Sequence, residues 1–287
     1  MPDSGSVADK KIGIMVGKEF RDALRSGKSV YGTLITSSSP KMFDIVITLG
    51  LDYVFFCTEH IFYNPDNLGW MCRAYKACGI NPVVRILEPD PFLATQALDA
   101  GAGAILVPYI ENVEDVRKLV GAVKYHPLKG DKLKKILSGD EKPSAELEAY
   151  LKKNNKNNTL LLNIESPNGV NNMEQFFSIQ SPDGPGVDGI VVGPHDLSVS
   201  FEMPEKYRSK EYLDMSCEII RKARAFGVAA GCHSGFRGGL DIQMEWVKAG
   251  ANIIMHSSDI FLFADKLQDD MNCIRELDRK AFLKGAR

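Results

Sequence analysis

The sequence predicts an α/β protein folded as a (β/α)8 TIM barrel. Its 287 residues suit one barrel of this kind, a fold that typically takes about 250 residues. Eight short runs rich in Val and Ile recur along the chain, and most lack alternation, as parallel strands buried on both faces do. Amphipathic segments separate the runs. An open doubly wound sheet is the alternative, but no GxGxxG motif follows the first run, which argues against a dinucleotide-binding sheet.

The elements are expected in a regular order. An N-terminal helix over 16–26 comes first, and Pro40, Pro65 and Pro91 stand where the first position of a later helix would be. Glycines precede the second, fourth and eighth runs, where they suit a helix C-cap. The expected strands cover 30–35, 52–57, 81–86, 102–110, 159–165, 188–193, 228–232 and 251–257.

We expect one domain over 1–287, with a flexible N-terminal segment at 1–15. One region breaks the alternation of strands and helices. Residues 124–158, between the fourth and fifth strands, are polar and include the sequences KLKK and KKNNKNN. We interpret this region as an insertion that is partly helical at 144–153. A solvated surface insertion and a lid over the site remain equally open.

Composition excludes several classes of protein. The net charge of −2, without a basic block, gives no reason to expect nucleic-acid binding. No apolar run approaches the roughly 18 residues of a membrane helix, and the N-terminus lacks the apolar stretch of a signal peptide. Six cysteines without a CxxC pair are expected to be reduced thiols. A cytoplasmic location is therefore the expectation.

Polar residues gather where the expected strands end. In a barrel of this kind, active sites lie at the carboxyl ends of the strands. The residues found there, or in the loop that follows, are Glu59, His60, Arg85, Asn163, Glu165, His195, Asp196, His233 and His256. The sequence therefore predicts a site at this end, in which His256 is structural and His233 lines the pocket without an assigned role.

Glu165 and Asp196 follow consecutive strands, so we expect them side by side. Two carboxylates with few other protein ligands suit Mg²⁺ or Mn²⁺, although each could instead cap a helix or pair with a lysine. Arg85 ends an internal strand and must meet an anion, which could be a substrate or simply Glu59 or Glu165. His60 could be a base or a structural histidine.

Six motifs, in their order and spacing, resemble the HpcH/HpaI aldolase family. These enzymes are metal-dependent class II pyruvate aldolases within the phosphoenolpyruvate/pyruvate barrel superfamily. The resemblance runs from about residue 20 to residue 277, nearly the whole chain. The motifs are RDALRSGKSVYGTLITSSSP (21–40), GLDYVFFCTEH (50–60), NPVVRILEPDP (81–91), LDAGAGAILVPYIENVEDV (98–116), NIES (163–166) and VGPHDLS (192–198).

The resemblance implies a binding site for a metal and a 2-oxo acid. Glu165 and Asp196 match the metal carboxylates, for Mg²⁺ or Mn²⁺ with Co²⁺ as a further candidate. Asn163 matches a residue that contacts the substrate. The backbone N–H groups of His195 and Asp196 match those that hold the substrate carboxylate.

The resemblance also implies the catalytic residues and the assembly. Arg85 matches the arginine that stabilises the enolate, and His60 matches the catalytic base. Asp99 matches an aspartate that reaches in from a neighbouring subunit and raises the basicity of that histidine. Family members are commonly hexamers that exchange the last helix, here roughly 260–277, between subunits.

The implied function is reversible aldol cleavage of a 4-hydroxy-2-oxo acid to pyruvate and an aldehyde. Three departures from the family's motifs leave the aldehyde side open. Cys57 stands where an acidic residue is common near the histidine, GPHD replaces GPAD, and no glycine-rich RG motif follows the fourth strand. The alternatives are decarboxylation of an oxaloacetate-type acid, an unusual acceptor, or a non-catalytic barrel that binds an oxo acid.

Overall fold

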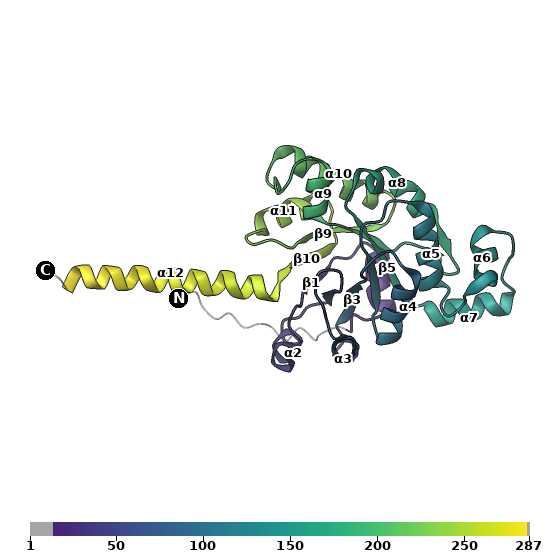
Figure 1. Cartoon of the computed structure of the whole chain (residues 1–287), viewed down its shortest axis with the longest axis horizontal. Helices are drawn as coiled ribbons and strands as arrows, with labels where there is room; N and C mark the ends of the chain where they lie inside the picture. Colours follow the sequence, from purple (N-terminus) through teal and green to yellow (C-terminus); the bar gives the residue numbers. More distant parts are fainter. Residues whose placement is uncertain (1–13, 286–287) are drawn as a thin grey trace.

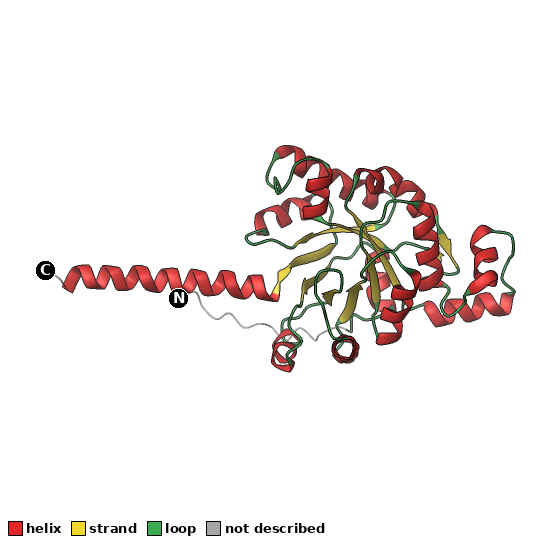
Figure 2. Ribbon diagram, in the orientation of Figure 1, coloured by secondary structure: helices red, strands yellow, loops and turns green. Residues whose placement is uncertain are grey.

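Eight parallel strands close into a barrel, in the order β1-β10-β9-β8-β5-β4-β3-β2, and helices surround it (Figure 2). The computed structural model describes residues 14–285. The barrel strands are β1 (Val30–Leu34), β2 (Tyr53–Cys57), β3 (Asn81–Arg85), β4 (Ala104–Val107), β5 (Thr159–Ile164), β8 (Gly189–Val192), β9 (Ala229–Ser234) and β10 (Ile253–Ser258). Each lies on one of the eight expected runs, so the predicted TIM barrel is confirmed. Two further short strands, β6 (Gln180–Ser181) and β7 (Gly184–Pro185), form a separate antiparallel pair.

Helices connect the strands and begin where their sequences favour a helix start. Pro40, Pro65 and Pro91 each stand at the start of a helix, as predicted. The helices are α1 (Lys18–Arg25), α2 (Pro40–Val46), α3 (Pro65–Ala77), α4 (Pro91–Ala100), α5 (Val113–Lys124), α6 (Gly130–Ser138), α7 (Ala145–Asn155), α8 (Pro167–Ser178), α9 (Pro194–Ser200), α10 (Lys210–Ala225), α11 (Leu240–Lys248) and α12 (Asp259–Gly285). Within residues 14–285, no helix has both the length and the apolar composition needed to cross a membrane.

The predicted flexible segment 1–15 lies outside the described residues as far as residue 13. Residues 14 and 15 of this segment are described, and Met15 contacts the chain next to β3. Met15 forms a parallel β-bridge with Ile80, and its N–H donates to the Gly79 carbonyl. Helix α1 then closes the amino-terminal end of the barrel, where Phe20 packs edge-on against Tyr53.

The polar insertion holds two helices, α6 and α7, on the outside of the barrel beside α5 (Figure 1). Helix α7 matches the predicted helix at 144–153, whereas α6 was not predicted because its sequence is mostly lysine and other polar residues. Leu133 and Leu137 of α6 pack over Gly121 of α5, where a Cβ would come within 2.8 Å of Leu137. No described residue of 124–158 lines the cavity at the carboxyl ends of the strands. The insertion is thus packed as a surface element of this chain.

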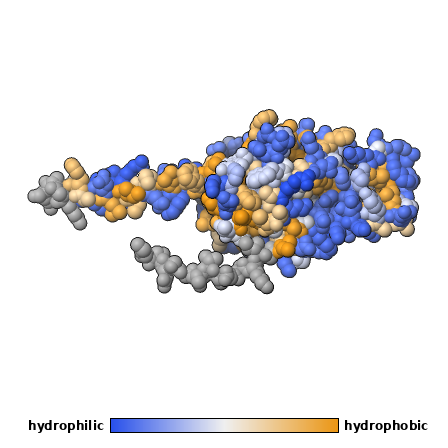
Figure 3. All heavy atoms as spheres, turned by 90° about the horizontal axis from the view of Figure 1, so that it is seen from below, coloured by the Kyte–Doolittle hydropathy of each residue, from blue (hydrophilic) through white to orange (hydrophobic). Residues whose placement is uncertain are grey.

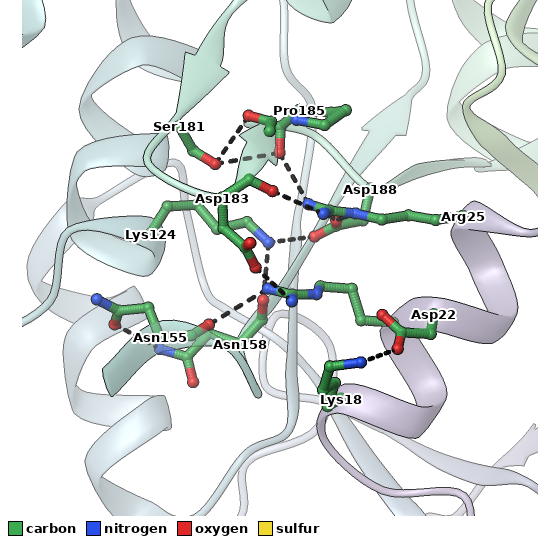
Figure 4. Close-up of polar contacts among 12 residues, drawn as sticks. Lys18, Asp22, Arg25, Lys124, Asn155, Asn158, Ser181, Asp183, Pro185 and Asp188 are labelled. Carbon is green, nitrogen blue, oxygen red and sulfur yellow. Dashed lines mark hydrogen bonds and ion pairs between the residues drawn. The ribbon is translucent and has the colours of Figure 1, made fainter. Parts of the chain in front are cut away.

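A buried ionic network fastens α1 to the amino-terminal side of the barrel (Figure 4). The carboxylate of Asp188 accepts hydrogen bonds from Lys124 Nζ, from Arg25 Nε at 2.8 Å and from the Leu160 N–H at 2.9 Å. Lys124 Nζ also donates to the Asn158 carbonyl at 2.7 Å. Burial lowers the pKa of Lys124 to about 8, although Asp188 opposes this change. The network is structural, because it lies at the end of the barrel opposite the site.

Asp188→Ala is expected to destabilise the protein by about 3–5 kcal/mol, because it leaves the buried Lys124 without its counter-ion. Asp22→Ala is the matched control. Its ion pair with Lys18, on the same helix as Arg25, has both side chains about half exposed, and such pairs contribute about 0–1 kcal/mol. Urea unfolding measures both free energies. Equal small losses would mean that the network does not hold α1 in place.

Helix α12 projects from the barrel into solvent (Figure 1). The predicted helix at 260–277 is extended by the structure to Gly285, since no proline or glycine interrupts the sequence before that residue. Its first residue, Asp259, anchors it to the loop after β1. The Asp259 carboxylate accepts hydrogen bonds from the N–H groups of Thr36 and Ser37 at 3.0 Å and from Thr36 Oγ1 at 2.7 Å.

Candidate active site

A cavity of about 560 Å³ opens at the carboxyl ends of the barrel strands. It brings together residues that lie far apart in the sequence. Five of the seven predicted site residues line it: His60, Arg85, Glu165, His195 and Asp196. His233 lines it too, as the sequence suggested. The strand ends therefore converge on one site as the barrel prediction required.

Glu165 follows β5 and is the most deeply buried carboxylate of the cavity, with 2% of the residue exposed. Its Oε2 accepts a hydrogen bond of 2.9 Å from the Tyr109 N–H, which a positive φ of 43° at Tyr109 presents. Its Oε1 has no hydrogen-bond donor among the described residues. A Cβ at Gly193 would lie 1.8 Å from that oxygen, so the glycine of the GPHD motif is required for this close approach.

Asp196 lies in the first turn of α9 and is partly buried. The N-cap of this helix is Gly193 rather than Asp196, so the alternative role of Asp196 as a helix cap is not what the structure shows. Burial raises the pKa of Glu165 to about 7, and the charges of Asp196 and Glu59 add to this effect, while Arg85 and the Tyr109 N–H oppose it. The site thus places two carboxylates near each other without enough donors for both charges.

Two neighbouring carboxylates repel each other, and a divalent cation between them would neutralise their charges. Within residues 14–285, no group of three or more His, Cys, Asp and Glu side chains could hold a metal ion. A cation here would be held by Glu165 and Asp196 and would take its other oxygens from water and substrate, as Mg²⁺ does. The buried Oε1 of Glu165, which accepts no hydrogen bond among the described residues, is the observation that supports this fit.

Arg85 is the last residue of β3, and its side chain is 8% exposed. Its Nε and Nη2 donate to Cys57 Sγ at 3.3 and 3.0 Å. Nη1 lies 3.8 Å from Glu165 Oε1, and Nε lies 3.0 Å from Glu59 Oε2. The Nε–H points at the sulfur, however, so the Oε2 of Glu59 has no hydrogen bond within the described residues. Burial lowers the pKa of Arg85, but Cys57, Glu59 and Glu165 together raise it above its usual value.

Cys57 therefore holds Arg85 rather than the imidazole of His60. Cys57 and Arg85 are paired in register on β2 and β3, which brings the thiol under the guanidinium. The thiol meets His60 through the backbone, because the His60 N–H donates to Sγ at 3.4 Å. The His60 side chain is 62% exposed, and its Nε2 lies 3.9 Å from Glu59 Oε2. His60 thus stands at the rim of the cavity.

Neither Asn163 nor Asp99 is among the described residues that line the cavity. Asn163 lies two residues after Leu161 on β5 and so points into the barrel as Leu161 does. Its Nδ2 donates to the Val191 carbonyl at 3.2 Å, and its Oδ1 is buried without a partner within residues 14–285. Asp99 is near the end of α4, with a side chain that is 65% exposed and 3.5 Å from His126 Nε2. It is too far along α4 to reach its own site, since that helix runs back toward the amino-terminal ends of the strands. Its predicted role across a subunit boundary stays a prediction.

Loop residues that the sequence did not single out form the outer part of the cavity. Tyr207 and Phe236 stack with ring centroids 4.4 Å apart, and Tyr207 Oη lies 3.2 Å from His195 Nδ1. Arg237 lines the cavity as well and donates to Gln268 Oε1 of α12 at 2.7 Å. These residues come from separate loops, and no sequence signal could have paired them.

Comparison with known proteins places the chain in a family. A model of the HpcH/HpaI aldolase/citrate lyase family matches residues 31–265. A curated 2-keto-3-deoxy-L-rhamnonate aldolase of Escherichia coli O9:H4 (strain HS) is 26% identical over 272 residues, which cover 95% of this chain and 98% of that protein.

Solved structures share the fold. The crystal structure of an HpcH/HpaI aldolase from Desulfitobacterium hafniense DCB-2 has a TM-score of 0.73 at 25% identity, covering 89% of this chain and 96% of that one. The citrate synthase SbnG has the same TM-score of 0.73 at 24% identity, covering 90% of this chain and 98% of that one, and it shows the fold alone. The chain therefore belongs to the HpcH/HpaI aldolase/citrate lyase family, as its motifs predicted, and is a carbon–carbon lyase of the aldolase type.

Proposed function

We propose that the protein catalyses the reversible aldol cleavage of a 4-hydroxy-2-oxo acid to pyruvate and an aldehyde, with Mg²⁺ or Mn²⁺ at Glu165 and Asp196. One observation carries the proposal. The buried Glu165 has an Oε1 without a hydrogen bond among the described residues; the Arg85 guanidinium lies 3.8 Å from that oxygen, and the charge of Asp196 also acts on the Glu165 carboxyl group. This arrangement supports both a cation and a substrate with negative charge.

When bound, a divalent cation held by Glu165 and Asp196 would supply a Lewis acid for a 2-oxo acid substrate. Hard oxygen ligands favour Mg²⁺ or Mn²⁺, and Co²⁺ is a further candidate. The backbone N–H groups of His195 and Asp196 lie in the first turn of α9, where a helix leaves N–H groups without acceptors. They are suited to hold the substrate carboxylate.

Arg85 stabilises the negative charge that develops on the keto oxygen as the bond between C3 and C4 breaks. Its guanidinium is held in place by Cys57 Sγ on one side, and Nη1 lies on the side of Glu165. A preorganised donor of this kind typically contributes about 10²–10³ in rate. His60, exposed at the cavity rim, is positioned to move a proton through water, and Asp99 of a neighbouring subunit is proposed to assist it.

The aldehyde that is released, which is the acceptor in the reverse reaction, is suggested by the names of the relatives. The aldolase relatives are named for 2-keto-3-deoxy-L-rhamnonate, which suggests a small hydroxylated aldehyde as one product. Decarboxylation of an oxaloacetate-type acid is the second candidate function, because it needs only the metal and Arg85.

The direct test incubates the protein with Mg²⁺ or Mn²⁺, pyruvate and a panel of aldehydes: acetaldehyde, glycolaldehyde, lactaldehyde and succinic semialdehyde. Chromatography of the products should reveal a 4-hydroxy-2-oxo acid for at least one aldehyde. Rapid release of CO₂ from oxaloacetate, with no aldol product from any aldehyde, would instead favour the second candidate.

We also propose a homo-oligomer, most simply a hexamer, that covers α12. The helix exposes apolar side chains along its length (Figure 3). These are Ile260, Leu262, Phe263, Leu267, Met271, Ile274, Leu277 and Phe282. Exposed apolar side chains that recur along a helix in this way usually mark an interface between proteins.

Leu267→Asp with Ile274→Asp is expected to disrupt the assembly, because both charges would be buried in the interface. Cutting the chain before Ile260 should do the same and also reduce activity, since Ile260 and Phe261 line the cavity. Asp270→Ala, which breaks only an exposed pair with Lys266, is the control. Light scattering that shows a fully active monomer of the unaltered chain would contradict the proposal.

A further inference from the structure

His233 occupies the wall of the cavity that faces Arg85. Residues alternate between the two faces of a strand, and on β9 Ala229 packs inside the barrel while Cys232 packs outside, so the His233 side chain points inward. In the barrel order, β9 and β3 are four strands apart in either direction. His233 and Arg85 therefore approach the cavity from opposite sides.

Both residues lie over the ring of Phe55, which forms the floor between them. The imidazole meets that ring edge-on, with centroids 5.3 Å apart and an interplanar angle of 81°, and Arg85 Cζ lies 5.8 Å from the same ring centroid. Gly235 packs closely against the other side of the imidazole, since a Cβ there would lie only 2.9 Å from His233 Cε1. The ring is thus fixed by packing.

The His233 Nε2 atom is buried and has no hydrogen-bond partner within residues 14–285. A buried polar nitrogen without a partner is costly, and in a cavity wall such an atom is a ready contact for a ligand. Burial, and next the charge of Arg85, lower the pKa of His233 to about 4, although the Ser257 backbone opposes them. The ring is therefore neutral near pH 7 and can accept or donate one hydrogen bond through Nε2.

We propose that His233 Nε2 hydrogen-bonds the C4 hydroxyl of the substrate and so positions the acceptor half of the reaction. The inference rests on the proposed function. There, the carboxylate and keto oxygens of the substrate already have partners from the β3, β5 and β8 side of the barrel. The C4 oxygen has no direct protein partner in that account, since His60 is proposed to act on it through water, and it lies toward β9 when the carbon chain extends away from Arg85.

His233→Leu tests this assignment, with two reactions measured on the full-length protein with Mn²⁺. The first is exchange of the pyruvate methyl protons with deuterated water, which involves no C4 oxygen. The second is release of pyruvate from racemic 4-hydroxy-2-oxopentanoate. Exchange should stay within about twofold of the unaltered protein, while kcat/KM for cleavage should fall about 10- to 100-fold, as for a lost hydrogen bond. His233→Asn, which keeps a polar group, should recover part of the loss.

His256→Leu is the matched control. His256 sits on the adjacent strand, hydrogen-bonded through Nδ1 to Ser234 Oγ at 3.2 Å, and is not among the described residues that line the cavity, so both reactions should be retained. Unchanged cleavage in His233→Leu would overturn the inference, as would equal losses of exchange and cleavage, because His233 would then serve the pyruvate half. A lack of exchange in the unaltered protein would instead overturn the proposed function, and this inference with it.

Discussion

Glu165→Gln and Asp196→Asn are each expected to lower the rate of aldol cleavage by more than about 100-fold. Losing a residue that only supports a metal ligand costs up to about 100-fold, and losing a ligand itself should cost more. Either change removes one of the two charges that hold the cation. Glu165→Gln is close in shape, so the barrel should stay folded. Cleavage assays with added Mn²⁺, together with circular dichroism, measure both outcomes.

Chelation provides an independent test of the same pair. EDTA should abolish activity, and added Mg²⁺ or Mn²⁺ should restore it. Asp241→Asn is the control variant, because that carboxylate is exposed and pairs with Arg208 outside the cavity. Full turnover of metal-stripped protein would contradict the proposed mechanism as a whole.

Arg85→Lys is expected to reduce turnover by about 10²–10³ while changing Mn²⁺ affinity little. Lysine keeps the positive charge but loses the planar fork. It therefore cannot donate to Cys57 Sγ through two nitrogens and also extend a third toward Glu165, as Arg85 does. Steady-state kinetics and titration with Mn²⁺ separate the two effects.

The opposite pattern would assign Arg85 a structural role. If Mn²⁺ binding fell sharply while the metal-saturated enzyme turned over normally, Arg85 would serve only to offset the charges of Glu59 and Glu165. Its ion pairs with both residues make this the relevant alternative. Cys57→Ala is a useful companion, because it removes the hydrogen bonds to the guanidinium without removing its charge.

The barrel and the residues at its strand ends were predictable because they depend on local sequence. A buried parallel strand is a short run of Val, Ile and Leu, and the polar residue that ends it must lie at the carboxyl face of the barrel. This placed Arg85 and Glu165 correctly. Helix α6 was missed because its stability comes from the packing of Leu133 and Leu137 on α5, which is a tertiary contact.

The contacts between side chains were not predictable from local sequence. The position of Cys57 beneath Arg85 depends on the register of β2 against β3, and the stacking of Tyr207 on Phe236 joins two loops that are separate in the chain. The orientation of Asn163 depends on which residues of β5 face inward. Each requires knowledge of a neighbour that only the closed barrel supplies.

Exchange of the methyl protons of pyruvate with deuterated water tests the central claim most directly, because it needs the metal carboxylates, Arg85 and a base but no aldehyde. NMR of pyruvate with the protein and Mg²⁺ or Mn²⁺ should show exchange well above the rate with metal alone. His60→Ala should slow it by about 10²–10⁴, the effect of losing a general base. No exchange above the metal-only rate would show that the site does not activate pyruvate, and the proposed aldol cleavage would have to be abandoned.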